Sequence, residues 1–152
     1  MQINNRQRPI LLLVGAALLI YLAWFFLRPV DIVAVHKRGR DSTAVLVRNF
    51  PLTAKGKINW WLENRIMLKE KYNVPAPNKD GSFSMTFWLF GDGYKEDKID
   101  ERLCFDDIKT DKRCIEKDAV FTVSRNRYNR TFFTVYNGRY ILENDGKLFK
   151  VK

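Results

Sequence analysis

The chain has 152 residues, of which 46 % are hydrophobic and 14 % aromatic, and its formal net charge is +10. Disordered chains contain far less hydrophobic and aromatic sequence, so this composition excludes a largely disordered protein. One histidine and two cysteines make an incomplete ligand set for a zinc ion, and the sequence therefore predicts no metal site and no cofactor.

An uncharged apolar run extends from Ile10 to Leu27. A helix of this length would measure about 27 Å, which is close to the roughly 30 Å hydrocarbon core of a bilayer. The run is apolar on all sides rather than along one stripe, which favours a membrane span over a buried helix of a soluble core. Arg8 and Arg28 flank it, and aromatic residues gather at its downstream end, as is typical of a membrane interface. The lipid bilayer is therefore the first predicted partner.

A cleaved signal peptide is the main alternative to a permanent anchor. Signal peptides have shorter apolar segments and end at two small residues separated by one position, and residues 10–34 match neither feature. We therefore predict an uncleaved, single-pass signal anchor, followed by enough chain for one domain. The predicted division is a short tail over residues 1–9, the anchor over 10–28 and one soluble domain over 29–152.

Positive charge is concentrated near the anchor and near the C-terminal end. Residues 1–57 contain nine Lys or Arg against two acidic residues, and residues 119–152 contain seven against two. Lys37, Arg38 and Arg40 follow the anchor, and basic residues at a membrane surface attract anionic lipid. Nucleic-acid binding is disfavoured, because no recognisable nucleic-acid-binding motif accompanies the charge.

The charges that flank the anchor do not decide which side of the membrane the domain occupies, because long domains are translocated largely regardless of charge. Cys104 and Cys114 are the two cysteines, and an even count in a small exported domain favours a disulfide over two reduced thiols. Cysteine catalysis would need a base with an orienting partner, and His36 is the single histidine. We therefore predict a Cys104–Cys114 disulfide and a domain in an oxidising compartment.

The first part of the domain is predicted to contain a hairpin and a helix. Residues 30–36 and 43–50 are rich in β-branched side chains and surround a turn at 38–42. Thr53 is suited to cap a helix that continues to about Tyr72, before the prolines of the next segment. The helix should pack on a sheet through one apolar face, formed by Ile58, Trp61, Leu62, Ile66 and Leu68.

Two adjacent tryptophans, Trp60 and Trp61, lie on this helix. Their side chains point about 100° apart, so they cannot both occupy the centre of one apolar face. Core packing or shielding of a sheet edge explains such a pair, but tryptophan is also frequent among the residues that anchor a protein partner. Trp60 and Trp61 are therefore the candidate partner contacts.

The remaining sequence predicts β-structure. Residues 83–90 become apolar on both sides, which is typical of a central strand. The acidic cluster of Asp106, Asp107 and Asp111 lacks the calcium-loop pattern and has basic neighbours, which predicts a solvated loop. Strand patterns with Asn-Gly and Asp-Gly turns between them occupy residues 119–125, 130–136, 139–143 and 147–151. We predict an α+β domain in which an amphipathic helix packs on a mainly antiparallel sheet that ends in a C-terminal β-meander.

Several strings of the sequence resemble one family, and they occupy residues 27–36, 49–53, 56–64, 91–94 and 103–107. They are similar to the enterobacterial putative membrane protein family, domain of unknown function 943, and the likeness covers nearly the whole chain. The resemblance implies a Gram-negative inner-membrane protein, which makes the periplasm the oxidising compartment. It supplies no catalytic residues, and it implies a role in immunity to a secreted toxin.

These observations favour a binding protein over an enzyme, because no nucleophile with its base, metal cluster or phosphate-binding loop is evident in the sequence. The expected function is to hold a periplasmic domain at the inner membrane, where it binds a protein. Immunity against an envelope-targeting toxin is the most concrete form of this expectation. The alternative is a structural or accessory subunit of an envelope membrane complex.

Overall fold

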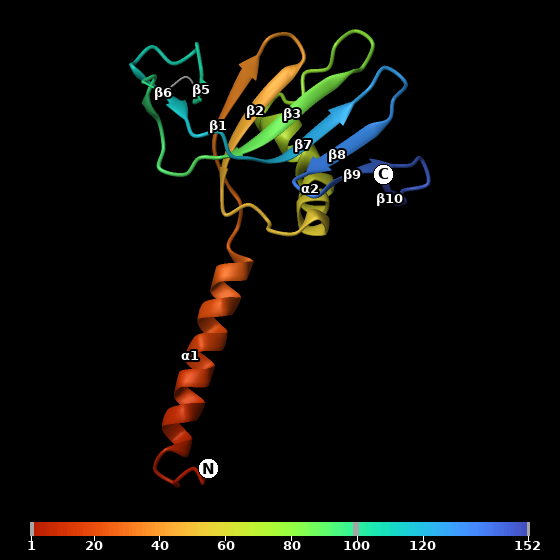
Figure 1. Ribbon diagram of the computed structural model, residues 1–152. Helices are drawn as coiled ribbons and strands as arrows, with labels where there is room; N and C mark the ends of the chain where they lie inside the picture. The colour runs from red at the N-terminus through yellow and green to blue at the C-terminus, as the bar shows by residue number, and fades with distance from the viewer. Residues whose placement is uncertain (1, 99–100, 152) are drawn as a thin grey trace.

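The computed structural model describes residues 2–98 and 101–151. Helix α1 (Arg8–Leu27) projects from one end of the domain that the following chain forms (Figure 1). Its length and composition suit a membrane span, and none of its side chains is buried against protein. Pro9 lies in the first turn, where the missing N–H has no helical partner to lose. Both predicted ends of the apolar run, Ile10 and Leu27, are exposed on this helix.

Seven strands form the main sheet, in the order β1-β2-β3-β7-β8-β9-β10. Neighbouring strands are antiparallel except for β2 and β3, which are parallel. Parallel neighbours need a crossover connection, and α2 (Ala54–Tyr72) supplies it. The prediction of an α+β fold with a mainly antiparallel sheet and a C-terminal meander is confirmed. The strands are β1 (Asp31–Arg38), β2 (Ser42–Arg48), β3 (Phe83–Leu89), β7 (Ala119–Arg125), β8 (Thr131–Val135), β9 (Gly138–Leu142) and β10 (Leu148–Val151).

Helix α2 begins and ends at residues suited to those positions. Thr53 caps its N-terminus by accepting a hydrogen bond from the Gly56 amide at 3.0 Å. Asn73 ends it in the left-handed conformation, with φ of 55°. Between them, α2 covers one face of the main sheet and buries three side chains in the principal core, Ile58, Trp61 and Leu68.

Ile66 does not join this core, although the sequence placed it on the apolar face. Its side chain is 68 % exposed. Residues five positions apart on a helix point about 140° apart around its axis. Ile66 therefore lies on a different side of the helix from the buried Trp61. The predicted apolar face was too broad on this side.

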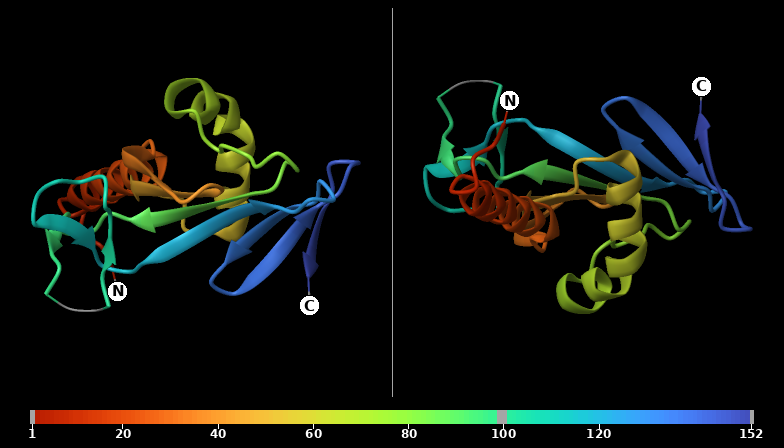
Figure 2. Two further views of the ribbon diagram at one scale, coloured as in Figure 1. Left: turned by 90° about the horizontal axis from the view of Figure 1, so that it is seen from above. Right: turned by 90° about the horizontal axis from the view of Figure 1, so that it is seen from below.

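A small second sheet lies against the other face of the main sheet. It contains β4 (Lys95–Glu96), β6 (Lys112–Ile115) and β5 (Leu103–Cys104) in that order. Figure 2 shows it beside the first strands of the main sheet, on the side opposite α2. The apolar side chains at this junction come from strands of both sheets and from the residues that directly follow β3 and β5, and they are Ala44, Leu46, Phe90, Leu103, Phe105 and Ile115. Strand β2 is therefore buried on both faces, because Val45 and Val47 point into the α2 core.

Strand β1 leads the chain away from α1 (Figure 1). At about 3.3 Å per residue, Arg38 at the far end of this strand is about 23 Å beyond Asp31. Attraction to a charged lipid surface decays over about 8 Å at physiological salt. The expectation that Lys37, Arg38 and Arg40 contact lipid is therefore wrong, because they lie at the end of the domain farthest from α1.

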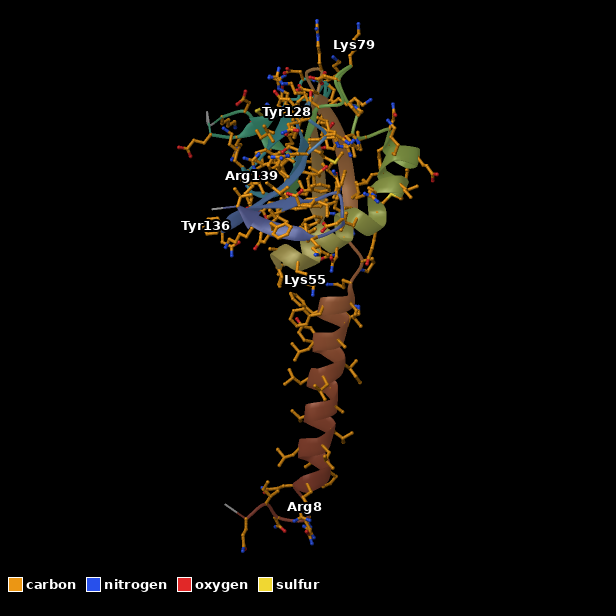
Figure 3. All side chains as sticks on the ribbon, turned by 90° about the vertical axis from the view of Figure 1, so that its right-hand side faces the viewer. Arg8, Lys55, Lys79, Tyr128, Tyr136 and Arg139 are labelled. Atoms are coloured by element: carbon orange, nitrogen blue, oxygen red, sulfur yellow. A yellow bond between two sulfur atoms is a disulfide. The ribbon has the colours of Figure 1, made fainter. Side chains whose placement is uncertain are left out.

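We call this far edge the membrane-distal end. It contains the β1–β2 turn, the α2–β3 loop and the β7–β8 turn. Figure 3 shows Lys79 and Tyr128 at this end, while Lys55 in the first turn of α2 lies at the opposite end, next to α1. The domain therefore has one end that faces the anchor and one that faces away from it.

Candidate functional site

A groove of about 380 Å³ lies beside the second half of α2, toward the membrane-distal end. We call it the distal groove. Its floor is largely apolar and includes the buried Trp61 and Phe83, with the exposed Ile66 at its edge. The full lining consists of Trp61, Arg65, Ile66, Lys69, Glu70, Pro75, Pro77, Phe83 and Arg125. Helix α2, the loop that follows it, the start of β3 and the end of β7 therefore all contribute to one depression.

The distal groove is positively charged. Arg65, Lys69 and Arg125 line it against a single acidic residue, Glu70. Within residues 2–98 and 101–151, none of the three basic side chains forms a salt bridge. Lys69 instead donates to the Pro75 carbonyl at 3.3 Å. The groove therefore offers an apolar floor together with cationic groups that form no salt bridge among the described residues.

Arg125 is the most constrained of these basic residues. Its guanidinium carbon lies 5.2 Å from the centroid of the Phe83 ring, in a cation–π arrangement. Its Nε atom is shielded from water and has no hydrogen-bond partner among the described residues. An unpaired N–H on a charged group is unfavourable, and the described residues leave this hydrogen-bond donor of Arg125 unused.

The structure places the two predicted partner contacts differently from each other. Trp61 is 4 % exposed and belongs to the principal core, although one side of it forms part of the groove floor. Trp60 is half-buried and packs edge-on against Phe50 and Phe87 at 5.4 Å and 5.7 Å. Both indoles thus pack in the fold, and Trp61 is the one that a ligand in the groove would approach. The sequence did not indicate the groove, whose lining comes from four separate segments.

A second polar site surrounds His36, the single histidine. Its Nδ1 atom is 2.7 Å from Asp107 Oδ2, and its Nε2 atom is 2.8 Å from the Tyr94 hydroxyl. The imidazole also stacks on Phe105, with 4.1 Å between ring centroids. These contacts join β1 at the edge of the main sheet to residues beside β4 and β5, so they hold the two sheets together.

The geometry of the His36 site favours a structural role over proton transfer. Both ring nitrogens have partners from the same chain, and the side chain is only 8 % exposed. One tautomer satisfies both contacts, with Nδ1 donating to Asp107 and Nε2 accepting from Tyr94. Burial, and secondly the Asp107 charge, raise the pKa of Tyr94 above its usual value. The phenol therefore stays protonated and continues to donate.

Sequence reasoning missed the His36 site, because Asp107 and Tyr94 lie far from His36 along the chain. The available signal was a polar side chain at a position of β1 that should face inward. Such a group requires a partner when it is buried. The pattern could therefore indicate that a partner exists, but not which residue provides it.

The two cysteines form a disulfide across the paired strands β5 and β6. The Cys104 and Cys114 sulfur atoms are 2.08 Å apart, and the two residues are directly opposite each other in the ladder. An Asp97 carboxylate lies within 4.8 Å of both sulfur atoms. A sulfur in a disulfide is not a thiolate, so this cluster is not a metal site while the bond is intact.

Comparison with known proteins identifies a family but no closer relative. No curated protein and no solved structure matches the chain. A family model described as "Enterobacterial putative membrane protein (DUF943)" matches residues 4–152. This match extends over α1 and the whole domain, in agreement with the resemblance found in the sequence and with the apolar N-terminal helix. The chain therefore belongs to the DUF943 family.

Proposed function

We propose that this protein is a membrane-tethered binding protein whose distal groove receives an acidic segment of a protein partner. The observation that carries the proposal is the groove itself, in which an apolar floor is surrounded by three basic side chains and one acidic one. Apolar pockets with charged rims are typical of protein-recognition sites, because the floor provides affinity and the charges select the partner. The proposal is for recognition rather than catalysis.

The partner that fits this groove has a bulky apolar side chain next to one or more carboxylates. The apolar side chain would contact Phe83 and the exposed edge formed by Ile66. A carboxylate would approach Arg125, whose guanidinium is held in place by the Phe83 ring. Because the groove lies toward the membrane-distal end, the partner can reach it from the aqueous compartment.

We also propose that this compartment is the periplasm and that α1 lies in the inner membrane. The Cys104–Cys114 disulfide supports this orientation, because disulfides persist in the periplasm and are rare in the reducing cytosol. A Gram-negative envelope protein with one N-terminal span would then present the groove to proteins that enter or reside in the periplasm.

Two kinds of partner are compatible with this proposal. In the immunity form, the partner is a toxin that acts on the envelope, and deletion of the gene should poison cells during contact with a toxin producer. In the accessory form, the partner is a resident membrane complex. Purification of the full-length chain in mild detergent should then recover the same subunits with no toxin present. Normal growth and no recovered subunits would exclude both forms.

The groove can be tested with a photo-crosslinking amino acid at position 66, introduced into the full-length chain in cells. A partner identified from the adduct is then titrated against the purified chain in nanodiscs. We expect the double variant Arg65→Glu and Lys69→Glu to bind it at least tenfold more weakly, because each change replaces attraction by repulsion.

The matched control is the double variant Lys147→Glu and Lys150→Glu, which makes the same charge change on two exposed residues that do not line the groove. It should bind like the wild-type chain. Equal affinity of the groove variant and the wild type would contradict the proposal. An equal loss in the control and in the groove variant would show a nonspecific charge effect and would also contradict it.

A further inference from the structure

A second pocket lies where α1 meets the domain. It has a volume of about 300 Å³, and its lining comes from the last turn of α1 and from the connection between β2 and α2. We call it the interfacial pocket. It is lined by Phe25, Phe26, Arg28, Asn49, Phe50, Pro51, Leu52 and Thr53. Most of this surface is apolar, although the pocket is at the outside of the molecule.

The position of the pocket relative to a bilayer follows from the length of α1. A helix of 20 residues is about 30 Å long, which equals the usual thickness of the hydrocarbon core. The end of α1 at Leu27 therefore lies at the boundary between acyl chains and headgroups. The interfacial pocket begins at that boundary, so lipid molecules are its immediate neighbours.

Arg28 supplies a cation at this boundary. Its guanidinium carbon is 4.9 Å from the Trp24 ring centroid and 4.7 Å from that of Phe25. Its Nε atom is shielded from water and has no hydrogen-bond partner in the described part of the chain, and none of the salt bridges there includes Arg28. The aromatic rings thus hold a charged group in place without neutralising it.

Apolar and basic residues of the domain continue this surface. Leu52 is 75 % exposed and Phe26 is 68 % exposed, which is unfavourable in water and favourable among acyl chains. The first turn of α2 contains no acidic residue. Lys55 in that turn lies at the end of the domain that faces α1 (Figure 3).

We propose that the interfacial pocket binds one anionic phospholipid of the leaflet next to the domain. Its acyl chains contact Phe26 and Leu52, and its phosphate lies against Arg28, with Lys55 adding positive potential. This lipid attaches the domain to the bilayer at a second point besides α1. It therefore keeps the distal groove directed away from the membrane. Binding of this lipid does not depend on what the groove binds.

The test is native mass spectrometry of the full-length chain released from detergent micelles, titrated with phosphatidylglycerol or with phosphatidylcholine. We expect the first phosphatidylglycerol to bind several-fold more tightly than phosphatidylcholine. The Arg28→Gln variant should weaken phosphatidylglycerol binding by about fivefold, as expected for one basic residue at a membrane surface. Arg28→Lys keeps the charge and should keep most of the preference.

Arg8→Gln is the matched control, because it removes the same charge from the opposite end of α1. It should leave the preference for phosphatidylglycerol unchanged. The proposal is overturned if the wild-type chain shows no preference between the two lipids, or if Arg28→Gln keeps it. It is also overturned if Arg8→Gln causes an equal loss, which would indicate general charge attraction. Circular dichroism of each variant checks that the fold is retained.

Discussion

At the residue scale, the imidazole of His36 is the side chain whose position depends most on distant partners. It is buried between two sheets and has a partner on each ring nitrogen. Asp107 is 56 % exposed, so water can partly replace it, whereas the Tyr94 contact is deeper in the junction. The Tyr94 hydroxyl is therefore the more important of the two partners for stability.

Replacing Tyr94 by Phe leaves the Nε2 atom of His36 buried without a donor. We expect Tyr94→Phe to lower the free energy of unfolding by about 1–2 kcal/mol, the usual effect of an unsatisfied buried acceptor. Urea unfolding of the full-length chain in detergent micelles measures this change. Tyr136→Phe is the control, because the Tyr136 side chain is fully exposed and its loss should change stability very little. Equal stabilities for the two variants would contradict the role given to Tyr94.

The same variant should alter the dependence of stability on pH. Burial, followed by the Asp107 charge, raises the pKa of Tyr94 above its usual value of 10.0. The stability from this group is therefore complete below about pH 10 and is lost as the pH rises through the folded pKa. Above pH 10, the wild-type chain should lose stability more steeply than Tyr94→Phe, and parallel pH curves would contradict this.

Individual residues were the least predictable part of the structure. His36 and Asp107 are 71 positions apart, and no local pattern connects residues at such a distance. The distal groove depends on Arg125 meeting Phe83, which follows from the pairing of β7 with β3. The Cys104–Cys114 bond could be predicted, because two cysteines allow only one intramolecular pairing.

At the element scale, we expect the small sheet to depend on its disulfide. Strands β4 and β5 have two residues each, and so few ladder bonds give little stability on their own. The disulfide joins β5 to β6 at directly opposite positions. The small sheet should therefore be the part of the domain most sensitive to loss of this bond.

We expect the double variant Cys104→Ser and Cys114→Ser to be about 2–3 kcal/mol less stable to unfolding, as estimated from the loop that the disulfide closes. Amide hydrogen exchange should increase in β5 and β6 before it increases in β7 and β8. Adding a reductant should destabilise the wild-type chain and leave the variant unchanged. Unaltered exchange in β5 and β6 would show that the small sheet does not need the bond.

The elements differ in how well the sequence predicted them, for physical reasons. Asn137-Gly138 at the turn between β8 and β9 is a strong local signal, and the last four strands are within one residue of their predicted bounds. In contrast, β6 is short and begins with Lys112 and Arg113, so it has no local strand signal. Its contacts are non-local, namely the disulfide to β5 and the apolar packing of Ile115 against the main sheet.

At the scale of the whole molecule, the two proposed binding sites lie at different ends of the protein. The interfacial pocket and α1 lie at one end, and the distal groove lies toward the other. The apolar run predicted the anchor directly, because an 18-residue apolar segment has few other stable environments. The sequence could not predict which end of the domain faces α1, because this depends on the path that the chain takes from α1 into β1.

The central claim is that an uncleaved α1 holds the disulfide-containing domain in the periplasm. The most direct measurement treats intact spheroplasts expressing the full-length chain with protease, and labels the cysteines with a mass-shifting thiol reagent before and after reduction. We predict that the domain is digested, and that Cys104 and Cys114 react only after reduction. A full-length chain protected from protease, with both cysteines reactive before reduction, would contradict the account.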